Sequence, residues 1–414
     1  MERFADFVKA YDLPAGDPAQ ARAEIESGSW LTTLRGRTAA ALRLRGGGRR
    51  LAYLDSMFPW ERSGFRYHEA LALYELRPDT LFFSLWETTD PFPATVFPLA
   101  DFAKVALSCG VTDAYGVFQM FLEGLVGMGA DASHAHPMEG PDISGILRRV
   151  GIRLHGSVYP GGGFTYNSYG LQRVRELAGR LTTTFSYIPE VLEEVPGVTP
   201  VPQAFTETRF YRRTVERWNE TTRMVCLFAA DRPPRKGIAA ALAAFKGLSP
   251  DEFHLHVVGP HEDRRGELPA ELATFHGWLS PVQLQALHRR CHAFISPVSI
   301  EPPGPDGSYR GVVDGFPTQA AADAMSSGCL LISANPVRDH RVLRPERDYV
   351  ECEPDGQRLR STLQWLAANR ALVRALAESG SDRVRERMDV RHGAAYKLAH
   401  MGFAAGNGVG AGER

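Results

Sequence analysis

The stretch of sequence that decides the fold covers residues 223–260 and reads RMVCLFAADRPPRKGIAAALAAFKGLSPDEFHLHVVGP. It begins with an apolar, β-rich run at 223–230, passes through a charged segment at 231–236, and continues as an alanine-rich segment at 237–245. A second apolar run at 253–258 ends before a glycine and a proline. This order predicts a strand, a turn, a helix and a second strand, which is the repeating unit of parallel α/β sheets.

The alternation of strands and helices continues towards the C-terminus. Strands are expected at 274–277, 292–298, 329–334 and 349–351, with helices at 281–290, 318–326, 356–369 and 372–388. Ser280 and Pro281 are suited to the N-cap and first position of their helix. Thr318 is a suitable N-cap for the next helix, which is expected to stop at Gly328.

The first half of the chain shows the same alternation less regularly. Strands are expected at 50–57, 80–85, 114–118, 152–159 and 182–187, with helices at 65–76, 99–109, 119–128, 143–150 and 170–180. The proline-rich segment 195–205 predicts a linker between two domains. The first 48 residues predict a helical or irregular extension without a site motif.

Length and composition limit the class of protein. A chain of 414 residues is too long for one hydrophobic core, which rarely exceeds about 300 residues, so two α/β domains are expected. The formal net charge of -1 argues against a protein that wraps nucleic acid. Five widely spaced cysteines, no secretory segment and no long apolar run predict a cytoplasmic protein with reduced thiols and no transmembrane segment.

The charged segment at 231–236 is the first candidate site. Arg232, Arg235 and Lys236 put three cations within five positions at the expected start of a helix, in a chain with few lysines. Cations are unfavourable at a helix N-terminus, so an anion should compensate them, and a diphosphate would fit. The alternative is a solvated basic turn.

Acidic residues follow the strand at 292–298. Glu301 and Asp314 lie in the expected loop, and Asp323 lies among alanines in the expected helix. A carboxylate on such an apolar helix needs a partner, because its unpaired burial is costly. Ribose hydroxyl groups could serve, and so could a nearby arginine.

These residues in this order resemble the glycosyl transferase group 1 family, which comprises retaining nucleotide-sugar glycosyltransferases of the GT-B fold. The resemblance implies two Rossmann-like, doubly wound domains facing a cleft. The acceptor-side domain would span 1–205 and regain a return helix at about 389–403, and the donor-binding domain would span 206–388. Residues 404–414 would form a disordered tail.

The resemblance also assigns roles to the residues of the second half. Arg232 and Lys236 would hold the donor diphosphate, although the loop is one residue shorter than in the family. Asp323 would bind the ribose, where the family has glutamate. Either Glu301 or Asp314 would be the family's first acid. Asp314 is favoured because it precedes Gly315, Phe316, Pro317 and Thr318, whose backbone would face the sugar and phosphate.

Three further segments complete the resemblance. Trp278 and Leu279 would lie where the family's backbone contacts the nucleobase. His155 would face the donor sugar, and its alternative role is that of a structural histidine. Ser63 and Gly64 occupy the place of the family's glycine-rich turn near donor phosphate and acceptor.

The implied activity is transfer of a hexose-type sugar from a nucleoside diphosphate sugar to an acceptor hydroxyl, with retained configuration and without a metal. No other cofactor is expected, and a metal site at His134 and His136 is not expected because a third ligand is missing. A nucleotide-sugar epimerase or another non-transferring enzyme of the same fold is one alternative. A non-catalytic protein of this fold is the other.

Overall fold

A computed structural model describes most of the chain. The described residues are 18–43, 48–61, 64–86, 88, 90–129, 140–160, 164, 167–214, 218, 223–300 and 314–403. The expected tail, Ser63, Glu301, His134 and His136 therefore lie outside the described residues. Across the described part, no helix combines the length and apolar character needed to cross a membrane.

The chain divides into two compact units. In the described residues, the N-terminal unit comprises 18–201 and 394–403, and the C-terminal unit comprises 202–300 and 314–393. The division falls slightly before the expected boundary at residue 205. The reason is that the backbone N–H groups of Phe205 and Thr206 both donate to the carbonyl of Met388, at 3.1 and 2.9 Å, which ties them to the C-terminal unit.

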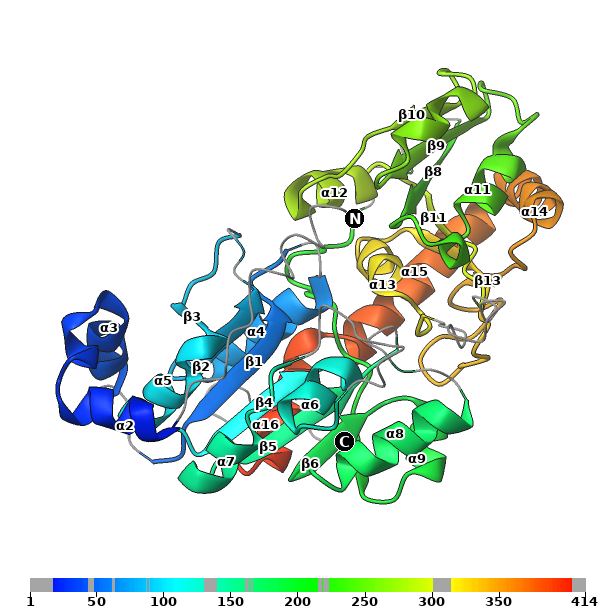
Figure 1. Ribbon diagram of the computed structural model, residues 1–414. Coiled ribbons are helices and arrows are strands. Elements are labelled where there is room, and N and C mark those ends of the chain that lie inside the picture. The colour runs from blue at the N-terminus through cyan, green and yellow to red at the C-terminus, as the bar shows by residue number, and fades with distance from the viewer. Residues whose placement is uncertain are drawn as a thin grey trace. The chain divides into compact units, whose positions relative to one another are not determined.

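The N-terminal unit is built on a seven-stranded sheet in the order β3-β2-β1-β4-β5-β6-β7, and each neighbouring pair is parallel (Figure 1). Its strands are β1 (Leu51–Met57), β2 (Leu81–Trp86), β3 (Val96–Pro98), β4 (Asp113–Val117), β5 (Arg153–Val158), β6 (Thr183–Ser186) and β7 (Val198–Pro200). The two outermost strands, β3 and β7, were not expected from the sequence, and β7 lies inside the segment predicted to be a linker.

Helices accompany these strands in the expected alternation. They are α2 (Pro18–Glu26), α3 (Leu34–Arg43), α4 (Gly64–Leu76), α5 (Phe102–Cys109), α6 (Gln119–Leu125), α7 (Ser144–Val150), α8 (Ser168–Ala178), α9 (Pro189–Glu194) and the later part of α16 (Val390–His400), with 3-10 turns η1 (Trp30–Thr32) and η2 (Leu99–Asp101). The extension before residue 48 is thus helical in its described part.

The C-terminal unit has a six-stranded sheet in the order β10-β9-β8-β11-β12-β13, again with parallel pairs. Its strands are β8 (Met224–Ala229), β9 (Phe253–Val258), β10 (Ala273–Phe275), β11 (Ala293–Ser296), β12 (Leu330–Ser333) and β13 (Val350–Glu351). When the strands of this unit are numbered along the chain, they lie in the sheet in the order 3-2-1-4-5-6, which is the Rossmann order.

The core of this unit follows from the apolar runs of the sequence. Its helices are α11 (Ile238–Phe245), α12 (Pro281–His288), α13 (Gln319–Ser326), α14 (Gly356–Ala368) and α15 (Arg370–Arg387), with 3-10 turns η3 (Pro234–Lys236) and η4 (Glu262–Glu267). Cys226 and Phe228 of β8 pack in one cluster with Leu242 and Phe245 of α11 and with Leu363 of α14. The helices α11 and α14 lie side by side over this face (Figure 1).

Both sheets therefore have the doubly wound topology that the alternation predicts. In such sheets, ligands bind at the carboxyl ends of the strands where the strand order reverses. In the C-terminal unit this position lies between β8 and β11, and in the N-terminal unit it lies between β1 and β4.

Candidate functional site

The charged segment 231–236 lies at this position in the C-terminal unit. It follows the carboxyl end of β8, next to the residues that follow β11. The N–H of Ser299 donates to the carbonyl of Arg235 at 2.9 Å, which joins the two loops. The strand order thus brings the cationic segment to the place where a doubly wound sheet binds its ligand.

Gly237 allows this close approach. Its φ is 80°, a left-handed conformation that disfavours other residues, and an added Cβ would lie 2.1 Å from the carbonyl oxygen of Pro297. The expectation of a helix that begins at residue 237 is corrected accordingly. A 3-10 turn at Pro234–Lys236 carries two of the cations, Arg235 and Lys236. Gly237 interrupts the helical backbone, and α11 begins at Ile238.

Two of the three cations share a carboxylate. Nζ of Lys236 lies 2.8 Å from Oδ2 of Asp314, and Nε of Arg235 lies 3.5 Å from the same oxygen. The three side chains are 21, 15 and 13% exposed, so all are largely withdrawn from water. Asp314 is therefore an anion within the chain that compensates these cations.

Arg232, which the resemblance assigned to the diphosphate, lies in a different environment. Its side chain is 64% exposed, and its Nε donates to the carbonyl of Pro260 at 2.9 Å. Its guanidinium also lies 3.6 Å from the exposed carboxylate of Asp263. Arg235, which the resemblance did not assign, is the arginine that lies beside Lys236 and Asp314.

The segment from Asp314 to α13 contains the expected cap and a buried turn. The Oγ1 of Thr318 accepts a hydrogen bond from the N–H of Ala321 at 3.3 Å, which confirms Thr318 as the N-cap. Phe316 is buried, and its carbonyl accepts from the side-chain amide of Gln203 at 2.8 Å. Gly315 and Pro317 flank it in the chain. Gln203 therefore supports the turn that presents Asp314.

Asp323 lies one helical turn after Gln319 and is buried, with 4% of the residue exposed. Nε2 of Gln319 donates to Oδ1 of Asp323 at 2.7 Å, so its partner is an amide instead of the arginine considered from the sequence. Thr206 and Tyr211 lie beside the carboxyl group. Burial raises the pKa of Asp323 to about 8, because the hydrogen bond from Gln319 offsets only part of the desolvation.

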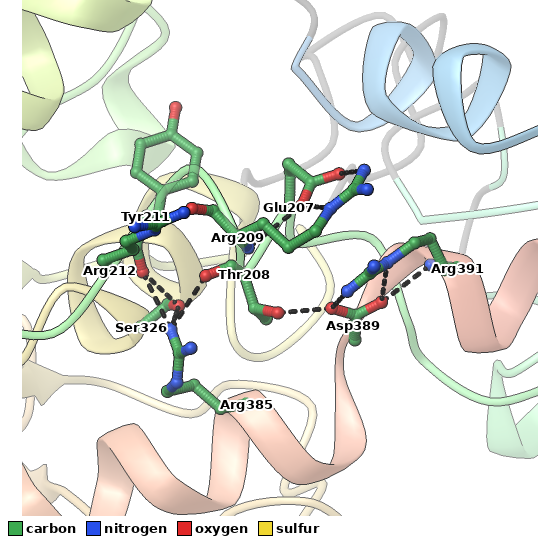
Figure 2. A network of polar contacts seen from close by, with 9 residues as sticks. All are labelled: Glu207, Thr208, Arg209, Tyr211, Arg212, Ser326, Arg385, Asp389 and Arg391. Carbon is green, nitrogen blue, oxygen red and sulfur yellow. Dashed lines mark hydrogen bonds and ion pairs between the residues drawn. The ribbon is translucent and has the colours of Figure 1, made fainter. Parts of the chain in front are cut away.

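Figure 2 shows a polar network that includes Tyr211, one of the residues beside Asp323. The hydroxyl of Ser326 donates to the carbonyl of Tyr211 at 2.7 Å, and Arg385 of α15 donates to the same carbonyl at 3.1 Å and to that of Thr208 at 2.9 Å. The hydroxyl of Thr208 donates to Asp389. These bonds hold the segment after the domain boundary against α13 and α15.

Trp278 and Leu279 follow the edge strand β10 of the same sheet. The N–H of Gly259, just after β9, donates to the carbonyl of Gly277 at 2.9 Å. The Trp278 side chain is 45% exposed. The backbone just before Trp278 therefore lies beside the end of β9.

His155 lies within β5 of the N-terminal unit, and the strand continues to Val158. The residue is 2% exposed, and Nε2 lies 3.1 Å from Oδ1 of Asp113 at the start of β4. Burial alone would raise the pKa of Asp113, but hydrogen bonds from His155, Arg49 and Arg153 hold it well below its usual range. A buried ring that pairs with a carboxylate near the amino end of the sheet favours the structural role for His155.

The carboxyl end of β1 carries a charged pair that the sequence analysis missed. Asp55 and Arg66 are both buried, and NH1 of Arg66 lies 2.6 Å from Oδ1 of Asp55. Arg66 belongs to the first turn of α4, which begins at Gly64. An aspartate near the end of an otherwise apolar strand was the available signal.

Metal-ligating side chains do not gather in the described part of the chain. No group of three or more His, Cys, Asp or Glu side chains there is arranged to hold a metal ion.

Part of the chain is similar to a known protein family. Residues 235–399 match the model of a family described as glycosyl transferase-like. No curated protein matches the sequence.

Solved structures match over most of the chain. Sucrose-phosphate synthase of Thermosynechococcus elongatus is 14% identical with a TM-score of 0.60, and the match covers 87% of this chain and all (100%) of that one. HepE of Anabaena, in complex with UDP and glucose, is 13% identical with a TM-score of 0.60, covering 86% and 99%. An α-glucosyltransferase in complex with UDP and DNA is 10% identical with a TM-score of 0.57, covering 86% and 100%. The chain therefore has the GT-B fold, with two Rossmann-like units, and its residues 235–399 are similar to the glycosyl transferase-like family.

Proposed function

We propose that this protein is a glycosyltransferase that moves a hexose-type sugar from a nucleoside diphosphate sugar to an acceptor hydroxyl. The observation that carries the proposal is the cationic turn at the carboxyl end of β8, in which the Lys236 side chain is only 21% exposed. It stands at the ligand-binding position of a doubly wound sheet. The match of residues 235–399 to the glycosyl transferase-like family supports it.

The proposed chemistry is electrostatic. When the bond between sugar and diphosphate breaks, negative charge develops on the leaving diphosphate. A preorganised ammonium group such as that of Lys236 stabilises this charge without reorganisation of solvent. Retention of configuration and independence of a metal belong to the proposal, on the strength of the resemblance.

Contacts of the donor sugar and ribose are proposed from the same unit. Asp314 is assigned as the acid that orients the sugar. The backbone of Gly315 and Thr318, which come after it in the chain, is assigned to the same sugar and phosphate. The ribose is assigned to Asp323 on the strength of the resemblance, together with Gln319, whose amide donates to the Asp323 carboxyl group. Trp278 and Leu279 are assigned to the nucleobase side.

The acceptor is assigned to the N-terminal unit, near the start of α4 at Gly64. We leave His155 out of the proposed chemistry, since its ring is buried against Asp113. Ser63 and Glu301 keep the roles that the resemblance gives them as proposals.

Thermal unfolding with free nucleotides tests the donor class. UDP comes first, because HepE has been solved with UDP-glucose, and GDP, ADP and dTDP complete the panel. A ligand that binds only the folded state at 100 times its Kd stabilises it by about 2.7 kcal/mol, so the cognate nucleotide should raise the midpoint by several degrees. A panel without any shift would contradict every nucleotide-sugar function.

Product analysis then separates the enzyme classes. Incubation with the matching nucleotide sugar and an acceptor panel, followed by NMR of the anomeric proton, should show a transferred sugar with the donor's configuration. The same reaction in EDTA tests whether a metal is needed. Release of an epimerised sugar would indicate an epimerase instead, and binding without any turnover would indicate a non-catalytic protein.

A further inference from the structure

Arg235, Lys236 and Asp314 form a compact charged cluster in the C-terminal unit. Both cations approach the same carboxylate oxygen, with Nζ of Lys236 at 2.8 Å and Nε of Arg235 at 3.5 Å from Oδ2 of Asp314. The charges are largely buried, where the interaction between charges is stronger than in water. The carboxylate thus neutralises one of two cations, and the cluster as a whole keeps one positive charge.

The backbone fixes where this cluster lies. Gly237 brings the 3-10 turn against Pro297, and the N–H of Ser299 donates to the carbonyl of Arg235. The two loops that carry these contacts follow β8 and β11, the strands at which the strand order reverses. The cluster therefore stands where the bound ligand of a doubly wound sheet lies.

While Asp314 stays beside Arg235 and Lys236, the cluster has one net positive charge, which does not balance the two negative charges of a dianionic ligand. A balance of charge requires that Asp314 leaves the two cations. A diphosphate group that approaches Lys236 meets the Asp314 carboxylate at the same ammonium group. Phosphate oxygens are stronger competitors for a guanidinium and an ammonium than one carboxylate is, since they carry more charge and allow bidentate contact. Exchange of the carboxylate for the diphosphate brings two cations against two negative charges.

We propose that Arg235 and Lys236 are the pair that binds the donor diphosphate, that Asp314 is their counter-ion in the ligand-free protein, and that the diphosphate displaces it. This inference rests on the proposed function and assigns to Arg235 the part that the resemblance gave to Arg232. No covalent step is involved. The released carboxylate can then accept a hydrogen bond from a sugar hydroxyl, so sugar recognition follows diphosphate binding.

Calorimetric titration of the full-length protein with inorganic pyrophosphate and with UDP tests the exchange. Asp314→Asn removes the competing charge with little change of shape, and it should tighten pyrophosphate binding at least about fivefold. Arg235→Ala removes a charge-assisted contact and should weaken binding about tenfold, the usual effect of one such bond. Arg232→Ala removes the same charge from the exposed neighbour and should weaken binding less than about threefold.

A variant that loses one positive charge outside the cluster serves as the matched control. Lys246→Ala, which removes an exposed cation at the end of α11, measures the general effect of one charge in the same unit. Unchanged or weaker pyrophosphate binding by Asp314→Asn would overturn the counter-ion role. Equal losses in Arg235→Ala and Arg232→Ala would overturn the assignment of Arg235, and this comparison holds even if the Asp314 variant does not fold.

Failure of the inference and failure of the proposed function are distinguishable. If UDP or another nucleoside diphosphate binds the wild type but Asp314→Asn binds it no tighter, the exchange is wrong and the glycosyltransferase proposal stands. If the wild type binds neither pyrophosphate nor any nucleotide of the panel, both are wrong.

Discussion

At Lys236 the chain holds an ammonium group 2.8 Å from the Asp314 carboxylate, with the side chain only 21% exposed. Lys236→Ala should reduce transfer at least about 100-fold, because a preorganised charge at the leaving group is lost. The fold should remain intact, since Arg235 still faces Asp314. Steady-state turnover and thermal unfolding of the same preparation check both parts. Lys236→Arg, which keeps the charge, is the control, and wild-type turnover by the alanine variant would contradict the diphosphate role.

Asp323 gives a prediction about pH. Its pKa is raised to about 8 by burial, above the unfolded value near 3.8, so the folded state holds the proton more tightly. The stability that this proton provides is complete below pH 3.8 and is lost as the pH rises towards 8. Asp323→Asn keeps the acceptor for Gln319 but cannot ionise. Its stability relative to wild type should therefore increase between pH 5 and pH 8, by up to about 1.4 kcal/mol per pH unit.

Chemical denaturation of both proteins across that range measures the difference. The matched control is Asp382→Asn, since Asp382 is exposed on α15 and should show no such trend. A difference between Asp323→Asn and wild type that stays constant with pH would show that the carboxyl group is ionised throughout.

Single residues show how far the sequence could predict the site. The N-cap Thr318 was predictable because caps are local signals, and the small number of lysines in the chain singled out Lys236 as a candidate. Which of Arg232 and Arg235 lies beside Asp314 was not predictable, since it depends on a 3-10 turn and on the left-handed Gly237 between them and the helix. The contact of Asp323 with Gln319 is local in sequence, but the nearby Tyr211 arrives from more than a hundred residues away.

The same distinction holds for elements. The strands β8 and β9 and the helix α11 are long apolar or alternating runs, so periodicity predicts them. The edge strands β3 and β7 span three residues each, and both end at a proline. An edge strand pairs on one side only and needs no continuous apolar run, so such short strands are fixed by their neighbours β2 and β6.

The helix α16 carries a buried ion pair that makes it a structural element of the N-terminal unit. Lys397 is 3% exposed at its side chain, and Nζ contacts Glu69 of α4 and the hydroxyl of Tyr159. Burial alone would lower the pKa of Lys397, but Glu69 and Tyr159 raise it above its usual value. The lysine therefore remains charged, and it supplies the positive charge that compensates the buried Glu69 carboxylate.

Lys397→Met should accordingly destabilise the N-terminal unit by about 3–5 kcal/mol, because it leaves the Glu69 carboxylate buried without its cation. The double variant Lys397→Met/Glu69→Gln removes both charges and should recover much of the loss. Hydrogen exchange of peptides from α4 and β4, measured by mass spectrometry, reports this unit specifically. Equal protection in the single variant and in wild type would contradict the role of the pair.

At the scale of the whole molecule, the described part of the chain first forms most of the N-terminal unit, up to residue 201. It then forms the C-terminal unit and returns to the N-terminal unit at residue 394. Length predicted two units, and the alternation predicted their sheets. The return could be expected only from the resemblance, because nothing in the local pattern of residues 390–403 distinguishes a helix of one unit from a helix of the other. The physical reason for the return lies in long-range contacts, such as those of Arg49 with the carbonyls of Met401 and Gly402.

Truncation after Gly393 tests this organisation. It removes Lys397 and the buried Leu398, Met401 and Phe403 from the N-terminal unit. Arg49 and Arg77 also lose the Phe403 ring, since the Cζ atom of each guanidinium lies 4.5 Å from the ring centroid. The N-terminal unit should become sensitive to limited proteolysis, while the C-terminal unit should keep its protease resistance and any stabilisation by nucleotide.

A chain that ends at Phe403 is the control, because it retains the whole of α16. Mass spectrometry of the fragments shows which unit is cut first. Because residues 202–393 hold their own sheet, core and charged cluster, cleavage confined to the N-terminal unit is the expected result. Simultaneous cleavage of both units would show that α16 stabilises the molecule as one cooperative body, and the C-terminal unit would then depend on a helix that contributes none of the residues proposed to bind the ligand.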